Sequence, residues 1–243
     1  MNILNLLKTS FIFLGMTLQS IALASTMAFI SVDEAVFFSA PAYTQSLNLI
    51  NTLGNTYLAN PQWHQDDSVM LGLGLQTYQR SDLNVNTSVR YIPRVSMQSQ
   101  GEVLQFRSPQ MNNLGYSYDV TSQLLLVDNM LTWTKYRFQP GLIIGIGRSS
   151  NNAGNYHEVP LENHAASGLN LFTDNRRVQL AFELGAALDY TFKDVIIECA
   201  YRYIDAGQGQ LGLSPDQNTF EHLSTGPLHY HMISLGVRFE RNL

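Results

Sequence analysis

One segment, Arg177 to Phe192, constrains the fold of this chain more than any other. Apolar side chains occupy every second position in it, with polar or small residues between them. The apolar positions are Val178, Leu180, Phe182, Leu184, Ala186, Leu188 and Tyr190. A period of two is typical of a β-strand whose two faces meet different surroundings. The run is long for a soluble sheet and matches the roughly 9 to 11 residues that a tilted strand needs to cross a bilayer.

Shorter alternation of the same kind recurs along the chain. We expect eight strands, at 44–54, 69–80, 83–95, 116–133, 141–148, 177–192, 195–204 and 229–239. The first is the weakest, and Pro93 should end or bulge the third. Asp128 and Asn129 interrupt the alternation of the fourth. Bacterial single-chain barrels have an even number of strands, so the count fits a barrel.

The connections between these strands alternate in length. Short ones lie near 81–82, 135–139 and 192–193, and long ones at 55–67, 96–114, 149–176 and 205–228. Outer-membrane barrels have short periplasmic turns and long extracellular loops, whereas a soluble β-sandwich has no reason for this asymmetry. The expected fold class is all-β: a transmembrane antiparallel up-and-down β-barrel with both ends in the periplasm.

The N-terminus has the features of an export signal. Lys8 precedes an apolar stretch that ends at Ala22-Leu23-Ala24, an A-x-A cleavage pattern. An uncleaved helical anchor is the alternative, because no charge lies between Lys8 and Asp33. The expected organisation is a signal peptide over 1–24, an N-terminal segment with the weak first strand over 25–65, the barrel over 66–239 and a tail over 240–243.

Composition narrows the function classes. Charged residues make up 14% of the chain, apolar residues make up 45%, and the formal net charge is −5. A soluble helical protein usually carries charge on about a quarter of its residues, and affinity for nucleic acid requires clustered Lys and Arg. We therefore expect no nucleic-acid partner. The single cysteine, Cys199, cannot form an internal disulfide.

Aromatic residues gather beside the expected short turns and at the C-terminal end. These are Tyr78, Trp133, Tyr136, Phe138, Tyr190, Phe192 and Phe239. Aromatic side chains concentrate where a membrane meets water, so we expect these to form a periplasmic girdle. A second set is expected at the opposite strand ends: Tyr116, Tyr118, Tyr201, Tyr203 and Tyr230. The alternative is the general preference of aromatic residues for strands.

The last strand, His231 to Phe239, resembles the C-terminal strand by which outer-membrane barrels are recognised for insertion. Together with Pro140–Gly147 and Ala200–Gly207, it makes the chain similar to the OmpA-like and opacity-type eight-stranded barrels, over roughly 66 to 239. The resemblance implies a bacterial outer-membrane location, contact with outer-membrane lipid and lipopolysaccharide, and binding of the barrel-insertion machinery through the last strand. It says little about activity, because that superfamily includes adhesins, anchors, narrow channels and lipid-modifying enzymes.

The polar face of the expected strands carries charge. The charged residues expected in the lumen are Glu183, Asp189, Glu198, Arg202 and Arg238. A hairpin turn at Phe192-Lys193 would place Glu183 opposite Arg202, which predicts an ion pair. An eight-stranded barrel encloses little more than its own side chains, so we expect these charges to close the lumen rather than line a pore. Glycines are expected to make room for larger lumenal neighbours at Gly145, Gly147, Gly185 and Gly236.

His229 and His231 are two residues apart on one strand and could chelate a cation, with Glu158, Glu162 or Glu221 as neighbours. The alternative is that they are polar residues without a ligand. Ser234 lies three residues after His231, so the two face opposite sides and cannot pair as nucleophile and base. We expect no cofactor and no catalysis.

The expected function is a structural or surface-interaction role, in which polar loops at 149–176 and 205–228 contact an unidentified extracellular ligand. Two alternatives remain open. One is a narrow outer-membrane channel for small solutes, and the other is a lipid A modifying enzyme.

Overall fold

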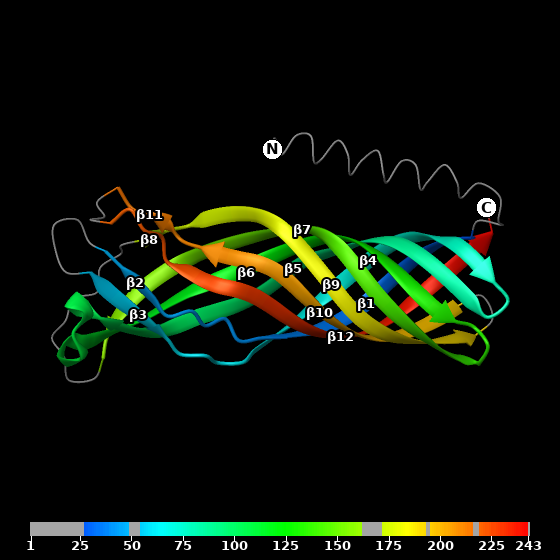
Figure 1. The fold of residues 1–243 in the computed structure, drawn as a ribbon, viewed down its shortest axis with the longest axis horizontal. Coiled ribbons are helices and arrows are strands. Elements are labelled where there is room, and N and C mark those ends of the chain that lie inside the picture. Colours follow the sequence, from blue (N-terminus) through cyan, green and yellow to red (C-terminus); the bar gives the residue numbers. More distant parts are fainter. Residues whose placement is uncertain (1–26, 49–53, 162–171, 193–194, 216–218, 243) are drawn as a thin grey trace.

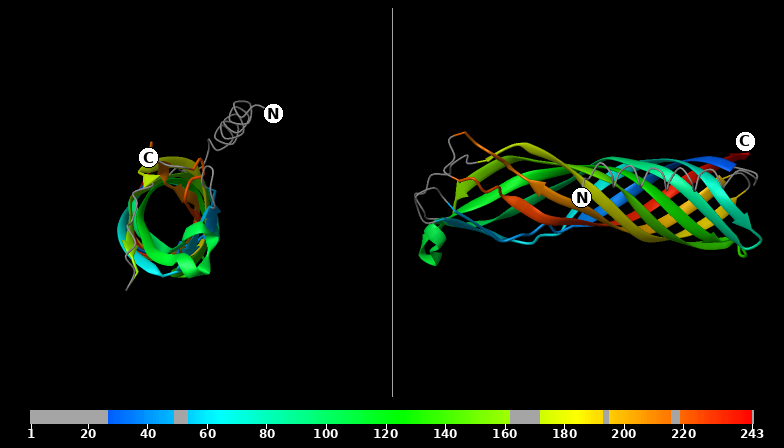
Figure 2. Two further views of the ribbon diagram at one scale, coloured as in Figure 1. Left: turned by 90° about the vertical axis from the view of Figure 1, so that its left-hand side faces the viewer. Right: turned by 45° about the horizontal axis from the view of Figure 1, so that its top comes forward.

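Eight antiparallel strands close into a ring. The computed structural model describes residues 27–48, 54–161, 172–192, 195–215 and 219–242. Around the ring the strands are β1 (Met27–Ser39), β4 (His64–Arg80), β5 (Leu83–Leu104), β6 (Asn112–Trp133), β7 (Phe138–Pro160), β9 (Asn175–Phe192), β10 (Val195–Gln210) and β12 (Ser224–Asn242). β12 pairs with β1 and closes the barrel (Figure 1). Figure 2 shows the ring end-on. The predicted fold class and the number of strands are confirmed.

The two ends of the barrel differ. At one end Arg80 pairs with Leu83 across a tight turn, and both ends of the described chain lie there, at the right of Figure 1. The other end carries additional elements. These are β2 (Gln45–Leu47), β3 (Asn55–Ala59), the pair β8 (Phe172–Thr173) and β11 (Gly212–Leu213), and the 3₁₀ turns Gln105–Arg107 and Pro109–Met111. The end with short turns is the periplasmic end of an outer-membrane barrel.

The first ring strand lies earlier than we expected. β1 covers Met27–Ser39, whereas the expected range, 44–54, holds only the short β2 among its described residues. Two large apolar side chains on the inward face of β1, Phe29 and Phe37, conceal its alternation. The barrel therefore begins in the segment that we assigned to an N-terminal extension.

The C-terminal boundary also differs. β12 continues to Asn242, so most of the expected tail at 240–243 belongs to a ring strand. The expected signal peptide at 1–24 lies outside the described residues.

Several strands are longer than the alternation indicated. β5 and β6 run on through most of the expected loop at 96–114, and β7 continues to Pro160. A register shift between Ile92 and Val95 marks a bulge at Pro93, which lets β5 continue past the proline. We wrongly expected residues 96–104 and 149–160 to lie in loops. Their apolar side chains face inward, so these segments lack the outward apolar residues from which we predicted the other strands.

The β9–β10 hairpin has a different register from the expected one. Phe192 pairs with Val195, so Arg202 lies opposite Gly185 rather than opposite Glu183. The absence of a side chain at Gly185 leaves room for Arg202. Glu183, the inward-facing residue before Gly185 on β9, contacts the arginine diagonally.

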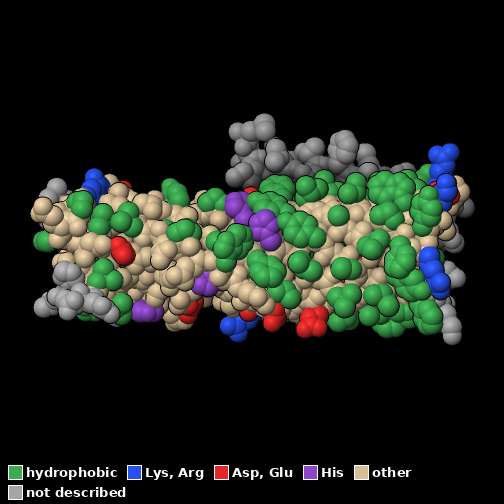
Figure 3. Space-filling view, turned by 90° about the horizontal axis from the view of Figure 1, so that it is seen from below, with side chains coloured by type: hydrophobic (Ala, Val, Ile, Leu, Met, Phe, Trp, Pro, Cys, Tyr) green, Lys and Arg blue, Asp and Glu red, His purple; other side chains and the backbone are tan. Residues whose placement is uncertain are grey.

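The outer surface is apolar over the half of the barrel nearest the short turns. This apolar belt is formed by outward residues such as Ile30, Leu73, Val89, Leu125, Ile144, Leu184 and Leu235. Figure 3 shows the hydrophobic side chains crowding that half, with histidines and acidic residues where they give way to a mostly uncharged polar surface. No helix among the described residues is long and apolar enough to cross a bilayer.

The strands continue well beyond the apolar belt. Arg148 lies at the edge of the belt, and β7 continues beyond it to Pro160. With a rise of about 3.3 Å per residue and a tilt of about 40°, this part adds roughly 30 Å of height. The barrel therefore has a membrane half and an extracellular half, which we call the stalk.

The interior changes character between the two halves. In the stalk the lumen is filled by a continuous apolar cluster that includes Phe37, Ile92, Tyr118, Val120 and Tyr230. Water surrounds the stalk, so burying apolar side chains inside it is favourable. Lipid surrounds the membrane half, where the lumen instead holds the charged residues described below.

Glycines make room for lumenal side chains at Gly145, Gly185 and Gly236, where a Cβ atom would approach Glu183, Arg202 and Asp33 respectively. Gly147 differs from the expectation, because a Cβ there would meet the backbone of Leu125 and Leu126. The most crowded of the three lumenal positions is Gly236.

We predict that Gly236→Ala lowers the free energy of unfolding by about 1–3 kcal/mol, because the new methyl group would overlap the carboxylate of Asp33. Gly115→Ala is the matched control, since a Cβ there meets its nearest atom at an ordinary 3.5 Å. Urea unfolding in lipid vesicles measures both variants. Equal stability of the two would contradict the crowding seen at Gly236.

Candidate functional site

A cluster of ionised side chains fills the lumen of the membrane half. Three arginines, Arg90, Arg202 and Arg238, lie among five carboxyl groups, and together the eight side chains come from six of the ring strands. The carboxyl groups belong to Asp33, Asp128, Glu183, Asp189 and Glu198. All eight side chains are nearly inaccessible to solvent. We call this set the lumenal charge network.

Glu198 is the centre of the network. Its carboxylate lies 2.6 Å from Nη2 of Arg202, 3.4 Å from Nη1 of Arg90 and 3.5 Å from Nη1 of Arg238. The alternation of β10 places Glu198 and Arg202 on the inward face, four residues apart. One acidic side chain therefore connects three cations from three strands.

Arg202 is also held on two further sides. Its Nε atom lies 2.8 Å from Oε1 of Glu183, and its Nη1 atom donates a hydrogen bond to Oγ of Ser234 at 2.9 Å. Arg202 is completely buried. A hydrogen bond from a charged donor is stronger than one between neutral groups, and together with the ion pair to Glu183 it holds the guanidinium across the lumen.

Arg238 links the network to the periplasmic rim. It binds Asp189 at 2.8 Å and reaches the partly exposed Glu240 at 3.2 Å. Its guanidinium also lies over the ring of Phe29, 5.2 Å from the centroid. The lumen is thus blocked by ordered side chains from the rim inward.

Three members of the network were missed from the sequence. Arg90 binds Asp128 at 2.6 Å and Asp33 at 3.7 Å. Asp33 lies in β1, which was not recognised as a strand. Asp128 was taken as a break in the alternation, but it continues it: Asp128 faces the lumen, and Asn129 faces outward, accepting a hydrogen bond from Thr87. An isolated acid on an otherwise apolar inward face is the signal that could have revealed it.

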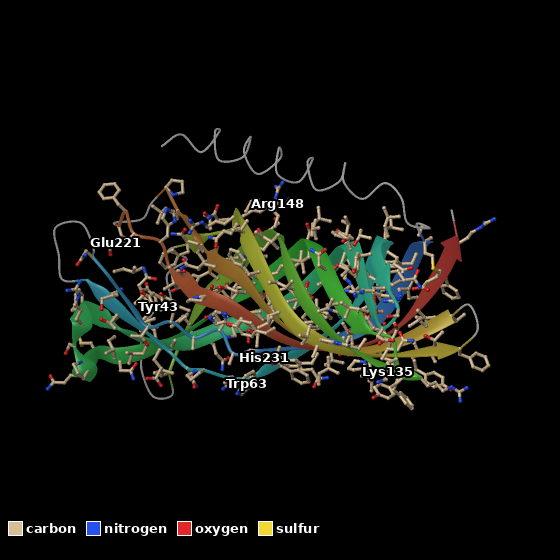
Figure 4. All side chains as sticks on the ribbon, turned by 45° about the vertical axis from the view of Figure 1, so that its right-hand side comes forward. Tyr43, Trp63, Lys135, Arg148, Glu221 and His231 are labelled. Carbon is tan, nitrogen blue, oxygen red and sulfur yellow. The ribbon has the colours of Figure 1, made fainter. Side chains whose placement is uncertain are left out.

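The expected periplasmic aromatics lie on the outer surface at the end with short turns. Phe138 and Tyr190 pack with ring centroids 5.1 Å apart, and the Arg137 guanidinium lies 5.2 Å from the Tyr190 ring. The other members are at least partly exposed: Tyr78, Trp133, Tyr136, Phe192 and Phe239. Lys135, labelled in Figure 4, lies at this end with its amine 5.9 Å from the centroid of the Tyr136 ring.

The aromatics expected at the opposite strand ends do not form one ring around the barrel. Tyr116, Tyr118 and Tyr230 are buried inside the stalk rather than exposed to lipid. Tyr230 exchanges a hydrogen bond with Ser122 at 2.6 Å. These tyrosines were misplaced because the inward face of the stalk is itself apolar, so aromatic residues there have the alternation of a lipid-facing girdle.

His229 and His231 lie on the outer surface at the edge of the apolar belt. The Tyr203 hydroxyl is 2.7 Å from Nδ1 of His229, and the Tyr201 hydroxyl is 2.8 Å from Nδ1 of His231. Trp63 packs beside His231, 5.9 Å between centroids (Figure 4). Each histidine therefore has a tyrosine partner on one ring nitrogen, and a metal would have only the other.

No group of three or more metal-ligating residues exists among the described residues. Of the neighbours considered for the histidines, Glu221 binds the amide and side chain of Asn48 at 2.6 and 2.9 Å, and Glu158 accepts a hydrogen bond from Tyr156 at 2.5 Å. Glu162 lies outside the described residues. Polar pairs of histidine with tyrosine describe this part of the surface better than a metal centre.

A nucleophile and base lie within hydrogen-bond distance at one exposed place. Ser117 Oγ is 2.8 Å from Nε2 of His157, and Nδ1 of His157 lies 3.2 Å from the backbone oxygen of Asn155. A catalytic base is usually oriented by a carboxylate, and a backbone carbonyl takes that position here. Ser234 is inside the barrel and His231 outside, so that pair is separated as expected.

The tip of the stalk exposes large apolar side chains to water. Phe220 is 80% exposed, and Phe106 and Met111 are 45% and 40% exposed. Phe106 and Arg107 both have positive φ, 55° and 56°, which L-residues adopt at a cost. Arg107 is held there by a hydrogen bond to Asn48. The described part of the tip therefore presents exposed apolar side chains beside a 3₁₀ turn that this hydrogen bond holds.

Comparisons with known proteins give limited similarity. No family model matches the chain, and no curated protein matches its sequence. Similar solved structures include the Neisserial surface protein A, with 14% identity over 87% of this chain and 97% of that one, at a TM-score of 0.44. OprG of Pseudomonas aeruginosa has 17% identity over 87% and 95%, at a TM-score of 0.43. The protease OmpT of Escherichia coli has 11% identity over 89% and 96%, at a TM-score of 0.42.

The closed ring and the apolar belt of this chain decide its location. A barrel without free edges, apolar outside and polar inside, is the form in which β-structure crosses a membrane. The chain has the fold of the outer-membrane β-barrels. Among the described residues, the buried charged side chains all lie in the membrane half, and the core of the stalk is mainly apolar.

Proposed function

We propose that this outer-membrane barrel is a closed, non-catalytic structural or surface-interaction protein that presents the tip of its stalk to an extracellular ligand. The single observation that supports this most is the filled lumen: the lumenal charge network occupies the membrane half and the apolar cluster occupies the stalk. If the barrel neither conducts ions nor catalyses a reaction, its function depends on its outer surface.

The tip is the part of that surface that fits a ligand best. Exposed aromatic side chains are typical anchors of protein interfaces, and Phe220 and Phe106 are exposed in this way. The last strand, β12, is the proposed contact for the insertion machinery. The apolar belt is the proposed contact for lipid and lipopolysaccharide.

We predict that the full chain reconstituted in a planar bilayer shows no ion-conducting steps, because charged side chains at hydrogen-bond distances bridge the lumen. Steady unitary conductance of the wild-type chain would favour the narrow channel instead.

We also expect lipid A of unchanged mass in cells that overproduce the chain. A new lipid A species would favour the enzyme.

The tip is tested by cross-linking on intact cells through a photoreactive group placed at position 220. The proposal expects a specific adduct that disappears when Phe106 and Met111 are both replaced by serine. A group placed at position 144, inside the apolar belt, is the control. Identical adducts from positions 220 and 144 would contradict a ligand site at the tip.

A further inference from the structure

Two arginines stand on the outer surface where the apolar belt ends. The register places the side chains of β6, β7 and β9 in rows: Val127, Ile146 and Phe182 form one row, and Leu125, Arg148 and Leu180 the next. Two rows further from the short turns, Thr121, Asn152 and Arg176 lie side by side. The two cations are thus on one face. Arg148 lies directly above an apolar row, and Arg176 lies beyond a row formed by Gln123, Ser150 and Val178.

Arg176 is held in a fixed position by neutral partners. Its Nε atom donates a hydrogen bond to Oγ of Ser150 at 2.6 Å, and its Nη2 atom donates one to Oε1 of Gln123 at 3.3 Å. Hydroxyl and amide oxygens orient the guanidinium without neutralising its charge. These three side chains, with Thr121 and Asn152, line a groove of about 390 Å³.

Neither arginine forms an ion pair within the described part of the chain. Arg148 projects from the barrel between two exposed leucines, on the side away from His231 (Figure 4). The acidic residues at the edge of the belt, Glu34 and Asp67, lie on β1 and β4 instead. On the β6–β7–β9 face the carboxylates nearest to Arg176 are those of Asp119 and Asp174, which lie further from the belt and accept hydrogen bonds from Asn155. The two arginines therefore carry the charge of this face at the level of the belt edge.

Resting on the proposed contact of the apolar belt with membrane lipid, we propose that Arg148 and Arg176, with the groove beside Arg176, bind the phosphate of an anionic lipid headgroup in the outer leaflet. The edge of the belt is the level at which headgroups meet the barrel, and a guanidinium binds phosphate through two parallel hydrogen bonds. The acyl chains of the same lipid would lie on the apolar rows at Ile146 and Phe182. One surface thus offers a charged site and an apolar track to a single ligand.

The test uses native mass spectrometry of the full chain in detergent, titrated with dioleoylphosphatidic acid and, separately, with dioleoylphosphatidylcholine. Phosphatidic acid is expected to form adducts at lower concentration than phosphatidylcholine. The Arg148→Gln/Arg176→Gln double variant should weaken phosphatidic acid binding about tenfold or more, because both charge-assisted contacts are lost. Arg177→Gln is the matched control, since this neighbouring side chain binds Gln210 and is absent from the groove.

Undiminished phosphatidic acid binding by the double variant would overturn the proposal. Displacement of the lipid by millimolar inorganic phosphate would do so too, because it would indicate a site for free phosphate without the apolar track. A dimer that disappears in the double variant would assign the face to a second copy of the chain. Both arginines face outward, so heat-dependent gel mobility of the variant is expected to show a folded barrel.

Discussion

Arg202→Met is expected to destabilise the barrel by about 3–5 kcal/mol, the usual cost of removing one partner from a buried ion pair. Methionine retains much of the side-chain length but leaves Glu183 without its cation at 2.8 Å and Glu198 without its shortest contact, 2.6 Å. Five carboxyl groups would then share two arginines. The change in the free energy of unfolding is measured by urea titration in lipid vesicles.

A double-mutant cycle identifies the cause of that loss. Adding Glu183→Gln to Arg202→Met removes one of the unpaired acids and should recover part of the stability. Glu240→Gln is the control at the rim, where the partner of Arg238 is partly exposed, and it should cost less than about 1 kcal/mol. Additive effects of the Arg202 and Glu183 substitutions would contradict a coupled network.

Leu184→Arg should destabilise the barrel by about 2–4 kcal/mol, the cost measured for a basic residue near the middle of the lipid face of such barrels. Leu184 is 63% exposed and lies midway along the outward apolar row of β9. Exposure of this extent would make the change nearly neutral on a water-facing surface. Reversible unfolding in vesicles measures the difference.

Gln100→Arg provides the comparison for Leu184→Arg. Gln100 lies on β5 within the stalk and lines a groove with Gly101 and Ser117. A surface substitution in water usually changes stability by less than about 0.5 kcal/mol. Similar losses from both substitutions would show that lipid does not end where the apolar belt ends.

The sequence was sufficient for the fold where the two faces of a strand differ. β9 and β10 carry apolar residues outward and charged or small ones inward, so the alternation predicted them and the lumenal position of Glu198. The stalk reverses this relation, because its apolar face points inward. For that reason Tyr118 and Tyr230 were expected outside.

Other errors have local causes. β1 was missed because Phe29 and Phe37 make its inward face as apolar as its outward face. With β1 missing, Asp33 could not be placed in the lumenal charge network. Pairings such as Arg90 with Asp128 depend on how strands β5 and β6 align, and a bulge at Pro93 shifts that register. No spacing in the sequence specifies such a shift.

The membrane half and the stalk are distinguished most directly by the chain's own cysteine. Cys199 faces outward between Leu188 and Leu235, within the apolar belt. In isolated outer membranes it should resist a charged, membrane-impermeant maleimide and react once detergent replaces the lipid. An Asp119→Cys variant in a Cys199→Ser background, placed on the outward face of the stalk, should react in both states. Rapid labelling of Cys199 in intact membranes, or protection at position 119, would contradict the division of the barrel into a lipid-facing half and a water-facing stalk.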